Sequence, residues 1–149
     1  MSFVERFILF SATGAGSGRA PFAPGTFGTL AGIPVVLLFL VIPSSMQVFF
    51  TLVVILFSIW VSDRAETLIG ESDPGCVVID EIAGFTVAMA GIHLSVLSVV
   101  SGFLIFRLFD IIKPFPIRYF EKNFHGGAGV VLDDVAAGLF STIVLQIFF

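Results

Sequence analysis

Two pairs of adjacent acidic residues stand inside apolar stretches of the sequence, Asp80-Glu81 and Asp133-Asp134. Ionisable side chains in such segments are costly to bury, and their presence suggests a function. Carboxylate oxygens suit Mg²⁺, which takes one or two carboxylates together with phosphate oxygens. Either pair alone could simply complement the positive end of a helix. Two pairs together favour a shared metal site.

Glycines close to these acids predict close helix contacts. Gly84 follows the first pair, and Gly138 follows the second. Small residues allow helix backbones to approach each other in a membrane. Gly28 and Gly32 form a GxxxG pattern that gives weaker evidence of the same kind.

A third group combines both charges at helical spacing: Arg107, Asp110 and Lys113. Residues three apart share one side of a helix. Arg107 and Lys113 could hold a phosphate group, and Asp110 could be a further metal ligand or an orienting partner. A salt-bridged helix end, with Lys113 reaching the membrane interface, is the alternative. The loop that follows adds Arg118 as another candidate for substrate binding.

His125 precedes two glycines and could donate a proton to a leaving alkoxide or orient a water molecule. A solvated loop histidine is the alternative. The Gly-rich segment 13–29 lacks the spacing of a P-loop or a dinucleotide fingerprint, so we expect no nucleotide site. Backbone amides at a Gly-rich helix start can still receive a phosphate, which makes Thr26 a candidate for substrate binding.

The composition indicates that lipid surrounds most of the chain. Hydrophobic residues make up 57% of the sequence and charged residues 12%, about half the usual share in soluble proteins. Five apolar stretches cover approximately residues 26–42, 46–61, 77–92, 94–112 and 130–149. Each approaches the ~20 residues needed to cross a bilayer.

These stretches predict an all-α fold: a polytopic membrane bundle of four or five transmembrane or re-entrant helices. The third stretch contains Asp80 and Glu81, so we expect it to be re-entrant or tilted. A short interfacial helix is expected at the N-terminus, because Glu5 and Arg6 interrupt its apolar run. The chain, residues 1–149, is predicted to form one domain.

The connections between stretches determine the expected orientation. If successive stretches cross alternately, the three long polar loops share one side of the membrane. All seven Lys and Arg residues lie on or next to that side, which marks it as cytoplasmic. The same topology brings the carboxylates to that face.

Several segments together closely resemble the bacterial phosphatidylglycerophosphatase A family. The segments are TGAGSGRAPFAPGTFGTLAG, VVIDEIAG, FRLFDIIKPFPIR, HGGAGVVLDD and VAAG. The resemblance covers nearly the whole chain. It implies magnesium-dependent hydrolysis of phosphatidylglycerophosphate to phosphatidylglycerol and inorganic phosphate in a bacterial inner membrane.

We therefore expect a lipid phosphatase in which a metal-activated water attacks the phosphate at the cytoplasmic face. Five acids would hold Mg²⁺: Asp80, Glu81, Asp110, Asp133 and Asp134. The catalytic candidates are Asp80, Glu81, Arg107 and His125, and the substrate-binding candidates are Arg107, Lys113, Arg118 and Thr26. The partner is a phospholipid in an anionic membrane, with no nucleic acid.

Two other classes of protein remain open. A small transporter or ion-binding protein would spread ionisable groups through the depth of the membrane. A structural subunit would tolerate neutralisation of the acids. A cysteine phosphatase is not indicated, because the only cysteine, Cys76, lacks the arginine that such enzymes place six residues later. The sequence leaves the oligomeric state open.

Overall fold

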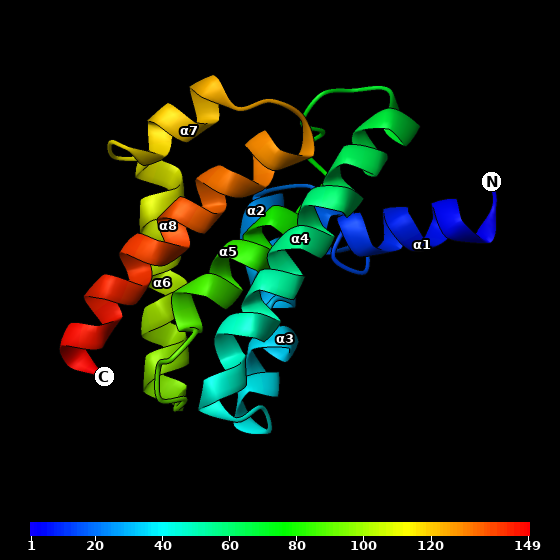
Figure 1. The fold of residues 1–149 in the computed structure, drawn as a ribbon. Coiled ribbons are helices and arrows are strands. Elements are labelled where there is room, and N and C mark those ends of the chain that lie inside the picture. The colour runs from blue at the N-terminus through cyan, green and yellow to red at the C-terminus, as the bar shows by residue number, and fades with distance from the viewer.

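The computed structural model covers residues 1–149 and contains only helices and turns, which confirms the predicted all-α class. Figure 1 shows the arrangement of its elements. The eight α-helices are α1 (Phe3–Ala12), α2 (Pro24–Ala31), α3 (Ile33–Leu37), α4 (Ser44–Ile69), α5 (Ile79–Met89), α6 (Val96–Ile112), α7 (Ile117–Asn123) and α8 (Gly126–Phe148). Two 3-10 turns, Ser17–Arg19 and Leu38–Leu40, complete the regular structure.

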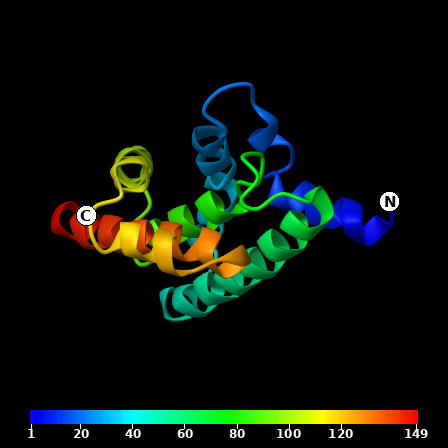
Figure 2. The same cartoon turned by 90° about the horizontal axis from the view of Figure 1, so that it is seen from above.

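Helix α5 lies at the centre of the molecule. Seen from above, it is flanked by α4 and α8 on one side and by α2 on the other (Figure 2). Every residue from Ile79 to Met89 is buried except the partly exposed Glu81. Such burial on all sides explains why this helix is apolar around its whole circumference. The main core cluster joins Phe85 and Met89 to Phe106 and Leu145.

Polar side chains from other helices support the far end of α5. The Thr142 hydroxyl donates to the carbonyl oxygens of Val87 and Ala88, at 2.9 and 3.3 Å. The backbone N–H of Gly91 donates to the Gln47 side chain at 3.1 Å. These bonds matter because terminal carbonyls lack partners within their own helix and are costly to bury unpaired.

Two helices, α4 and α8, are long and apolar enough to cross a membrane. Both exceed the predicted stretches, since α4 continues to Ile69 and α8 begins at Gly126. Helix α5 has only 11 residues and rises about 16 Å, half of a hydrocarbon core. Helix α6 has 17 residues, and the 24–40 segment is divided among α2, α3 and a 3-10 turn.

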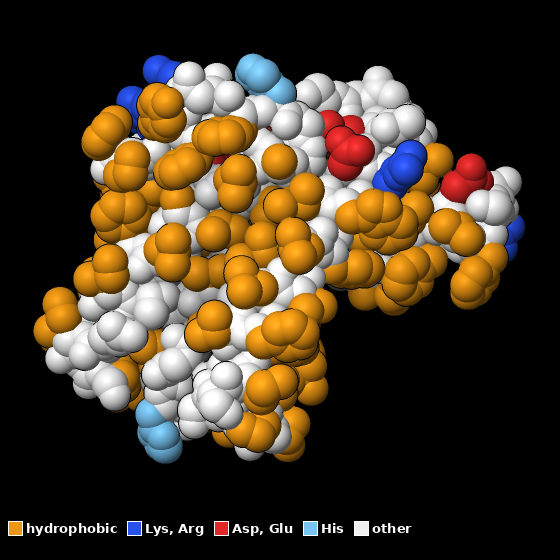
Figure 3. All heavy atoms as spheres, viewed as in Figure 1, with side chains coloured by type: hydrophobic (Ala, Val, Ile, Leu, Met, Phe, Trp, Pro, Cys, Tyr) orange, Lys and Arg blue, Asp and Glu red, His pale blue; other side chains and the backbone are white.

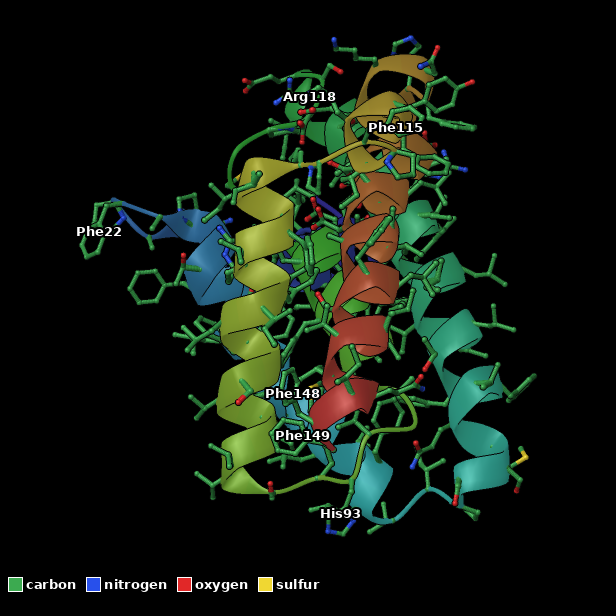
Figure 4. The ribbon with its side chains drawn as sticks, turned by 90° about the vertical axis from the view of Figure 1, so that its left-hand side faces the viewer. Phe22, His93, Phe115, Arg118, Phe148 and Phe149 are labelled. Carbon is green, nitrogen blue, oxygen red and sulfur yellow. The ribbon has the colours of Figure 1, made fainter.

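Large apolar side chains are exposed over much of the surface, far beyond the isolated examples normal on a soluble protein. Helix α4 shows this most clearly, with exposed Phe49, Leu52, Leu56 and Trp60. Figure 3 shows that the Lys, Arg, Asp and Glu side chains visible in this view lie in its upper half, and that hydrophobic and uncharged ones make up the lower half. Figure 4 shows His93 at the end opposite Arg118.

Helix α1, the predicted N-terminal helix, projects sideways from the bundle (Figure 1). Ile8 and Ala12 are buried in a cluster with Val61 and Ala65 of α4. Figure 3 shows hydrophobic side chains along the lower edge of this arm, and charged ones mainly on its upper edge. The Phe7 ring packs on Phe57 of α4, with ring centroids 6.3 Å apart. The helix therefore has two apolar faces, one buried and one exposed.

Candidate active site

A polar cavity of about 350 Å³ opens at the end of the bundle where the charged residues gather. Its walls come from the start of α2, the loop between α4 and α5, the ends of α5 and α6, helix α7 and the first turns of α8. Most of the predicted site residues line it: Asp80, Glu81, Asp110, Lys113, His125, Asp133 and Asp134. The structure thus gathers these predicted residues around one open cavity.

Asp80 and Glu81 lie in the first turn of α5. The preceding residue Val78 is fixed by its backbone N–H, which donates to the carbonyl oxygen of Ala12 at 2.8 Å. Asp80 is buried, with 8% of its surface exposed, and its Oδ1 atom has no hydrogen-bond partner. Helix-dipole stabilisation alone would favour an exposed acid at this position. A buried and unpaired one suggests a ligand.

Asp133 and Asp134 lie about two turns inside α8, because this helix begins at Gly126. The alternative that this pair only complements the positive end of a helix assumed a helix start near residue 130, and that start was wrong. The glycines account for the earlier start, since a Cβ at Gly127 would lie 2.6 Å from the backbone nitrogen of Asp63 in α4. The helix-dipole effect fades within the first turn, so it does not explain the second pair.

Gly84 and Gly138 bring the two acid pairs together, as predicted. A Cβ at Gly84 would lie 2.6 Å from the carbonyl oxygen of Asp134, and one at Gly138 would collide with the carbonyl oxygen of Gly84. The backbones of α5 and α8 can approach this closely only because both positions lack a side chain. The contact lies one turn below Asp80 and sets its distance from Asp134.

Three carboxylates converge as a result: Asp80, Glu81 and Asp134 each offer an oxygen, and these atoms lie within 4.8 Å of one another. One buried oxygen of each has no hydrogen-bond partner: Oδ1 of Asp80, Oε2 of Glu81 and Oδ2 of Asp134. Three negative charges at this separation repel strongly in a buried site unless a cation lies between them. The all-oxygen donor set fits Mg²⁺ better than a softer metal.

Lys113 is the cationic wall of the cavity. Its Nζ donates to Oδ2 of Asp133 at 2.8 Å and to Oε1 of Glu121 at 3.2 Å. Burial lowers the pKa of this ammonium, but the hydrogen bonds and charges of Asp133 and Glu121 outweigh burial and raise the pKa above its usual value. The residue ends α6 with a left-handed backbone, φ +48°. A lysine in this unfavourable conformation is a further sign of function.

Arg107 and Asp110 form an ion pair on α6. Asp110 lines the cavity. Arg107 does not line it, and its guanidinium group lies close to Gly25 in the first turn of α2. A Cβ at Gly25 would lie 2.6 Å from Oε1 of Glu81 and 3.1 Å from an Arg107 guanidinium nitrogen. The Nε atom of Arg107 is buried without a partner. Arg107 is therefore placed behind the carboxylates, close to Glu81.

The remaining predicted residues occupy different positions. His125 lines the cavity immediately before α8. Arg118 is exposed on α7 and lines a separate outer pocket with Phe115 and Tyr119. Thr26 lies in the first turn of α2 and does not line the cavity, although its neighbours Pro24 and Gly25 do. The structure thus brings His125 to the acids but not Arg118 or Thr26.

Comparison with known proteins identifies the family. The model of the family Phosphatidylglycerophosphatase A matches residues 10–149. The chain belongs to the phosphatidylglycerophosphatase A family. It is 36% identical to Phosphatidylglycerophosphatase A of Escherichia coli over 90% of this chain and 78% of the relative. The Haemophilus influenzae protein of the same name is 38% identical over 93% of this chain and 86% of that protein.

A relative with a different name is equally similar. The chain is 40% identical to the Putative phosphatidylinositol-3-phosphatase of Bacteroides thetaiotaomicron over 91% of this chain and 89% of the relative. No solved structure matches the chain. The site of this phosphatidylglycerophosphatase A family member is therefore described here from its own geometry.

Sequence reasoning did not single out three acids that line the cavity: Glu66, Asp73 and Glu121. Oε1 of Glu66 accepts the backbone N–H of Asp73 at 2.9 Å and so shapes the loop between α4 and α5. None of the segments that carry the resemblance to the family lies within residues 62–76. The sequence offered one signal for Glu66 and Asp73. Segment 62–76 is polar, and the predicted topology already placed it on the same side of the membrane as the other acids.

Proposed function

We propose that this chain is a lipid phosphatase that hydrolyses phosphatidylglycerophosphate to phosphatidylglycerol and inorganic phosphate. The observation that carries the proposal is the convergence of three carboxylates, each with a buried oxygen that lacks a hydrogen-bond partner, in a cavity that a lysine also lines. Family membership supports the reaction class, because two relatives carry the name Phosphatidylglycerophosphatase A. The cavity offers both a cation-binding side and an anion-binding side, as a phosphate ester requires.

In this proposal Mg²⁺ is held by Asp80, Glu81 and Asp134, with Asp133 and Asp110 as further contributors. Bound there, the ion would activate water as the nucleophile and offset charge on the phosphate oxygens. The fit rests on the three unpaired oxygens and on the absence of sulfur or imidazole donors among them.

The other residues act on the phosphate and the leaving group. Lys113 can reach a phosphate in the cavity by exchanging one of its two carboxylate partners for a phosphate oxygen. Arg107 keeps Asp110 and Glu81 in place and adds positive charge behind them. His125, at the rim, is positioned to deliver a proton to the glycerol oxygen as it leaves.

We place the chain in the cytoplasmic membrane of a bacterium as a multi-pass protein. Helices α4 and α8 have the length and apolar surface to cross it. Helix α6 and the α2–α3 segment are proposed to cross as well, and α5 to enter from one side only. Because the basic residues gather at the cavity end, that end would face the cytoplasm.

The shared chemistry of the possible substrates is a phosphate monoester on a lipid headgroup. The Bacteroides relative is named for a phosphoinositide, which carries such a group on inositol. Phosphatidylglycerophosphate remains our choice, since the family model bears its name. The competing class, a cation transporter, is less favoured because the carboxylates gather in one layer.

The decisive test measures phosphate release in mixed micelles, with and without Mg²⁺, from phosphatidylglycerophosphate and phosphatidylinositol 3-phosphate. We expect the first to be hydrolysed faster, only with Mg²⁺, and Asp80→Asn to abolish the reaction. Full activity of Asp80→Asn would remove Asp80 from the site. Faster hydrolysis of the phosphoinositide would change the substrate, and Mg²⁺ uptake by sealed vesicles without phosphate release would support the transporter.

Binding of the ion can be measured without turnover. A ligand that binds only the folded state stabilises it, by about 2.7 kcal/mol at a hundred times its Kd. We therefore expect Mg²⁺ to raise the melting temperature of the detergent-solubilised protein. The same addition should leave that of Asp134→Asn unchanged, and an equal rise in both would place the ion elsewhere.

A further inference from the structure

We infer that a second lipid site exists beside α1, where the chain binds the headgroup and one acyl chain of an anionic phospholipid. This site is separate from the catalytic cavity and shares no lining residue with it. The inference rests on the membrane placement proposed above. It is carried by two adjoining pockets of opposite character.

The first pocket is basic. It has a volume of about 300 Å³ and lies between α1 and the 13–19 loop, with Arg6 on one wall and Arg19 on the other. Neither arginine forms a salt bridge, and no acidic residue lines the pocket. Two arginines that line one pocket and have no carboxylate partner can offer planar, charge-assisted hydrogen bonds to a phosphate.

The loop itself does not supply the binding groups. The backbone N–H groups of residues 14–19 all donate to carbonyl oxygens within residues 10–16. Any anion in the pocket would therefore be held by the arginine side chains. Removal of those two charges should abolish its binding without unfolding the loop.

The second pocket is apolar, with a volume of about 430 Å³, and it shares Phe10 and Ala15 with the first. Its walls come from the end of α1, from Val35 of the α2–α3 segment, from Val54 of α4, and from α5. Both volumes fall within the range of about 300–1,000 Å³ usual for ligand sites. A basic pocket that adjoins an apolar one matches a charged headgroup joined to a hydrocarbon chain.

Ser58 adds a polar group at the intermediate depth. It lines the apolar pocket, is fully buried, and its hydroxyl has no hydrogen-bond partner. It lies about one helical turn, roughly 5 Å, from Val61, where α1 packs on α4. The ester groups of a phospholipid lie a short distance below its phosphate. An ester carbonyl oxygen in the pocket could therefore accept a hydrogen bond from the Ser58 hydroxyl.

The surroundings of the two pockets fit a lipid better than a protein partner. The exposed face of α1 carries Phe3, Phe7 and Phe10, and Trp60 lies nearby on α4, packed on Phe57. Aromatic residues and arginines together are typical of a membrane interface. Phe57, which is exposed on the apolar surface of the bundle, also lines the apolar pocket, and lipid tails are expected at that surface.

The test is a native mass spectrometry titration of the full chain in neutral detergent. The probes are phosphatidylglycerol and phosphatidylcholine with the same acyl chains. We expect at least a tenfold preference for phosphatidylglycerol, and loss of that preference in the Arg6→Gln/Arg19→Gln double variant. Arg64→Gln removes an exposed arginine that lines neither pocket and should keep the preference.

A second pair of variants tests the acyl-chain pocket. Val54→Trp would fill it, whereas Val53→Trp places the same bulk on the neighbouring, exposed position of α4 that does not line it. We expect weaker binding of phosphatidylglycerol only in Val54→Trp. The second site would be overturned if both valine variants bound phosphatidylglycerol equally well. It would also be overturned if the double arginine variant kept its lipid preference, or if Arg64→Gln lost that preference to the same extent.

Phosphate release measured on the same preparations separates this inference from the proposed function. Arg6 and Arg19 lie outside the catalytic cavity, so their variants should still hydrolyse phosphatidylglycerophosphate. In the unmodified chain, hydrolysis without a preference for phosphatidylglycerol would refute the second site alone. A lipid preference without hydrolysis would refute the proposed reaction alone.

Discussion

The two acid pairs reach the same cavity in different ways. Asp80 and Glu81 stand in the first turn of a short buried helix, where helix geometry alone could favour an acid. Asp133 and Asp134 stand inside a long helix, where it could not. Within the second pair the roles also differ, since Asp133 is paired with Lys113 whereas Asp134 keeps an unpartnered oxygen.

This difference separates two kinds of carboxylate in one site. Asp80, Glu81 and Asp134 have oxygens that only an added ligand could satisfy. Asp133 and Asp110 already have cationic partners within the chain. The first kind should bind the ion most strongly, and the second should contribute less to the ion and mainly position the residues that meet the phosphate.

The largest expected effect separates the two members of the second pair. Asp134→Asn removes a charge that no side chain can replace, and we expect phosphate release to fall by about 10²–10³-fold. Asp133→Asn should cost about 10–100-fold, the range for residues that orient a site. Rates measured at saturating Mg²⁺ test this order, with Glu71→Gln outside the cavity as control. An Asp133→Asn defect as large as that of Asp134→Asn would erase the distinction.

Gly84→Ala tests whether the helix contact sets the distance between the pairs. The new methyl group would lie 2.6 Å from the Asp134 carbonyl oxygen and 2.7 Å from the Phe106 ring. We expect a loss of about 1–3 kcal/mol in unfolding free energy from overpacking. A displacement of the acids near 1 Å would reduce activity about 10²-fold. Thermal unfolding and phosphate release measure the two effects.

Gly75→Ala serves as the control for this substitution, because a Cβ there would meet nothing within 4 Å. Its stability should match that of the unmodified chain. If Gly84→Ala were equally harmless to both stability and activity, the contact between α5 and α8 would not control the site.

Lys113→Gly separates charge from backbone strain. The left-handed backbone at this position suits glycine, so the conformational cost falls while the ammonium is lost. We expect about tenfold slower hydrolysis, mainly through a higher KM for the phosphate substrate. The unfolding free energy should change little, since the lost ion pairs and the relieved strain oppose each other. Unchanged KM and kcat would mean that Lys113 only forms ion pairs with Asp133 and Glu121 and does not bind the substrate.

The smallest effect is expected at Arg118, which the sequence suggested for substrate binding but which lies outside the cavity. Arg118→Gln should change KM by no more than about threefold, the scale of an exposed charge near an anionic surface. Assays in vesicles with increasing phosphatidylglycerol content would show this change. A loss comparable with that of Lys113→Gly would indicate that α7 closes over the substrate.

Much of this site could be predicted from the sequence, because its determinants are local. The charges of Asp80, Glu81 and Asp134, the glycines after them, and the alternation of apolar stretches led to one acidic layer. The residues at which helices begin and end were harder to predict from the sequence. Helix α4 continues through Ala65 and Glu66, good helix formers, after its apolar run has ended. Helix α8 begins early because Gly127 fits against α4, a tertiary contact that hydropathy cannot reveal.

The length of α5 also could not be predicted from its local sequence. Its apolar sequence continues to Ile92, but the helix stops at Met89 and the chain turns through Gly91 with positive φ. The roles of Glu66 and Asp73 depend on how the 62–76 segment folds back over the cavity. Such long-range packing leaves no periodic trace in the sequence.

The hydrogen bonds from Thr142 and Gln47 at the lower end of α5 have a consequence for the opposite end. A continuous helix of 11 residues connects these bonds to the first turn that carries Asp80 and Glu81. The hydrogen bonds from Thr142 and to Gln47 at one end of α5 therefore help to fix the position of Asp80 and Glu81 along the helix axis. The position of the acids along the helix axis thus depends on contacts about 16 Å away as well as on the contacts of Val78 and Gly84 beside them.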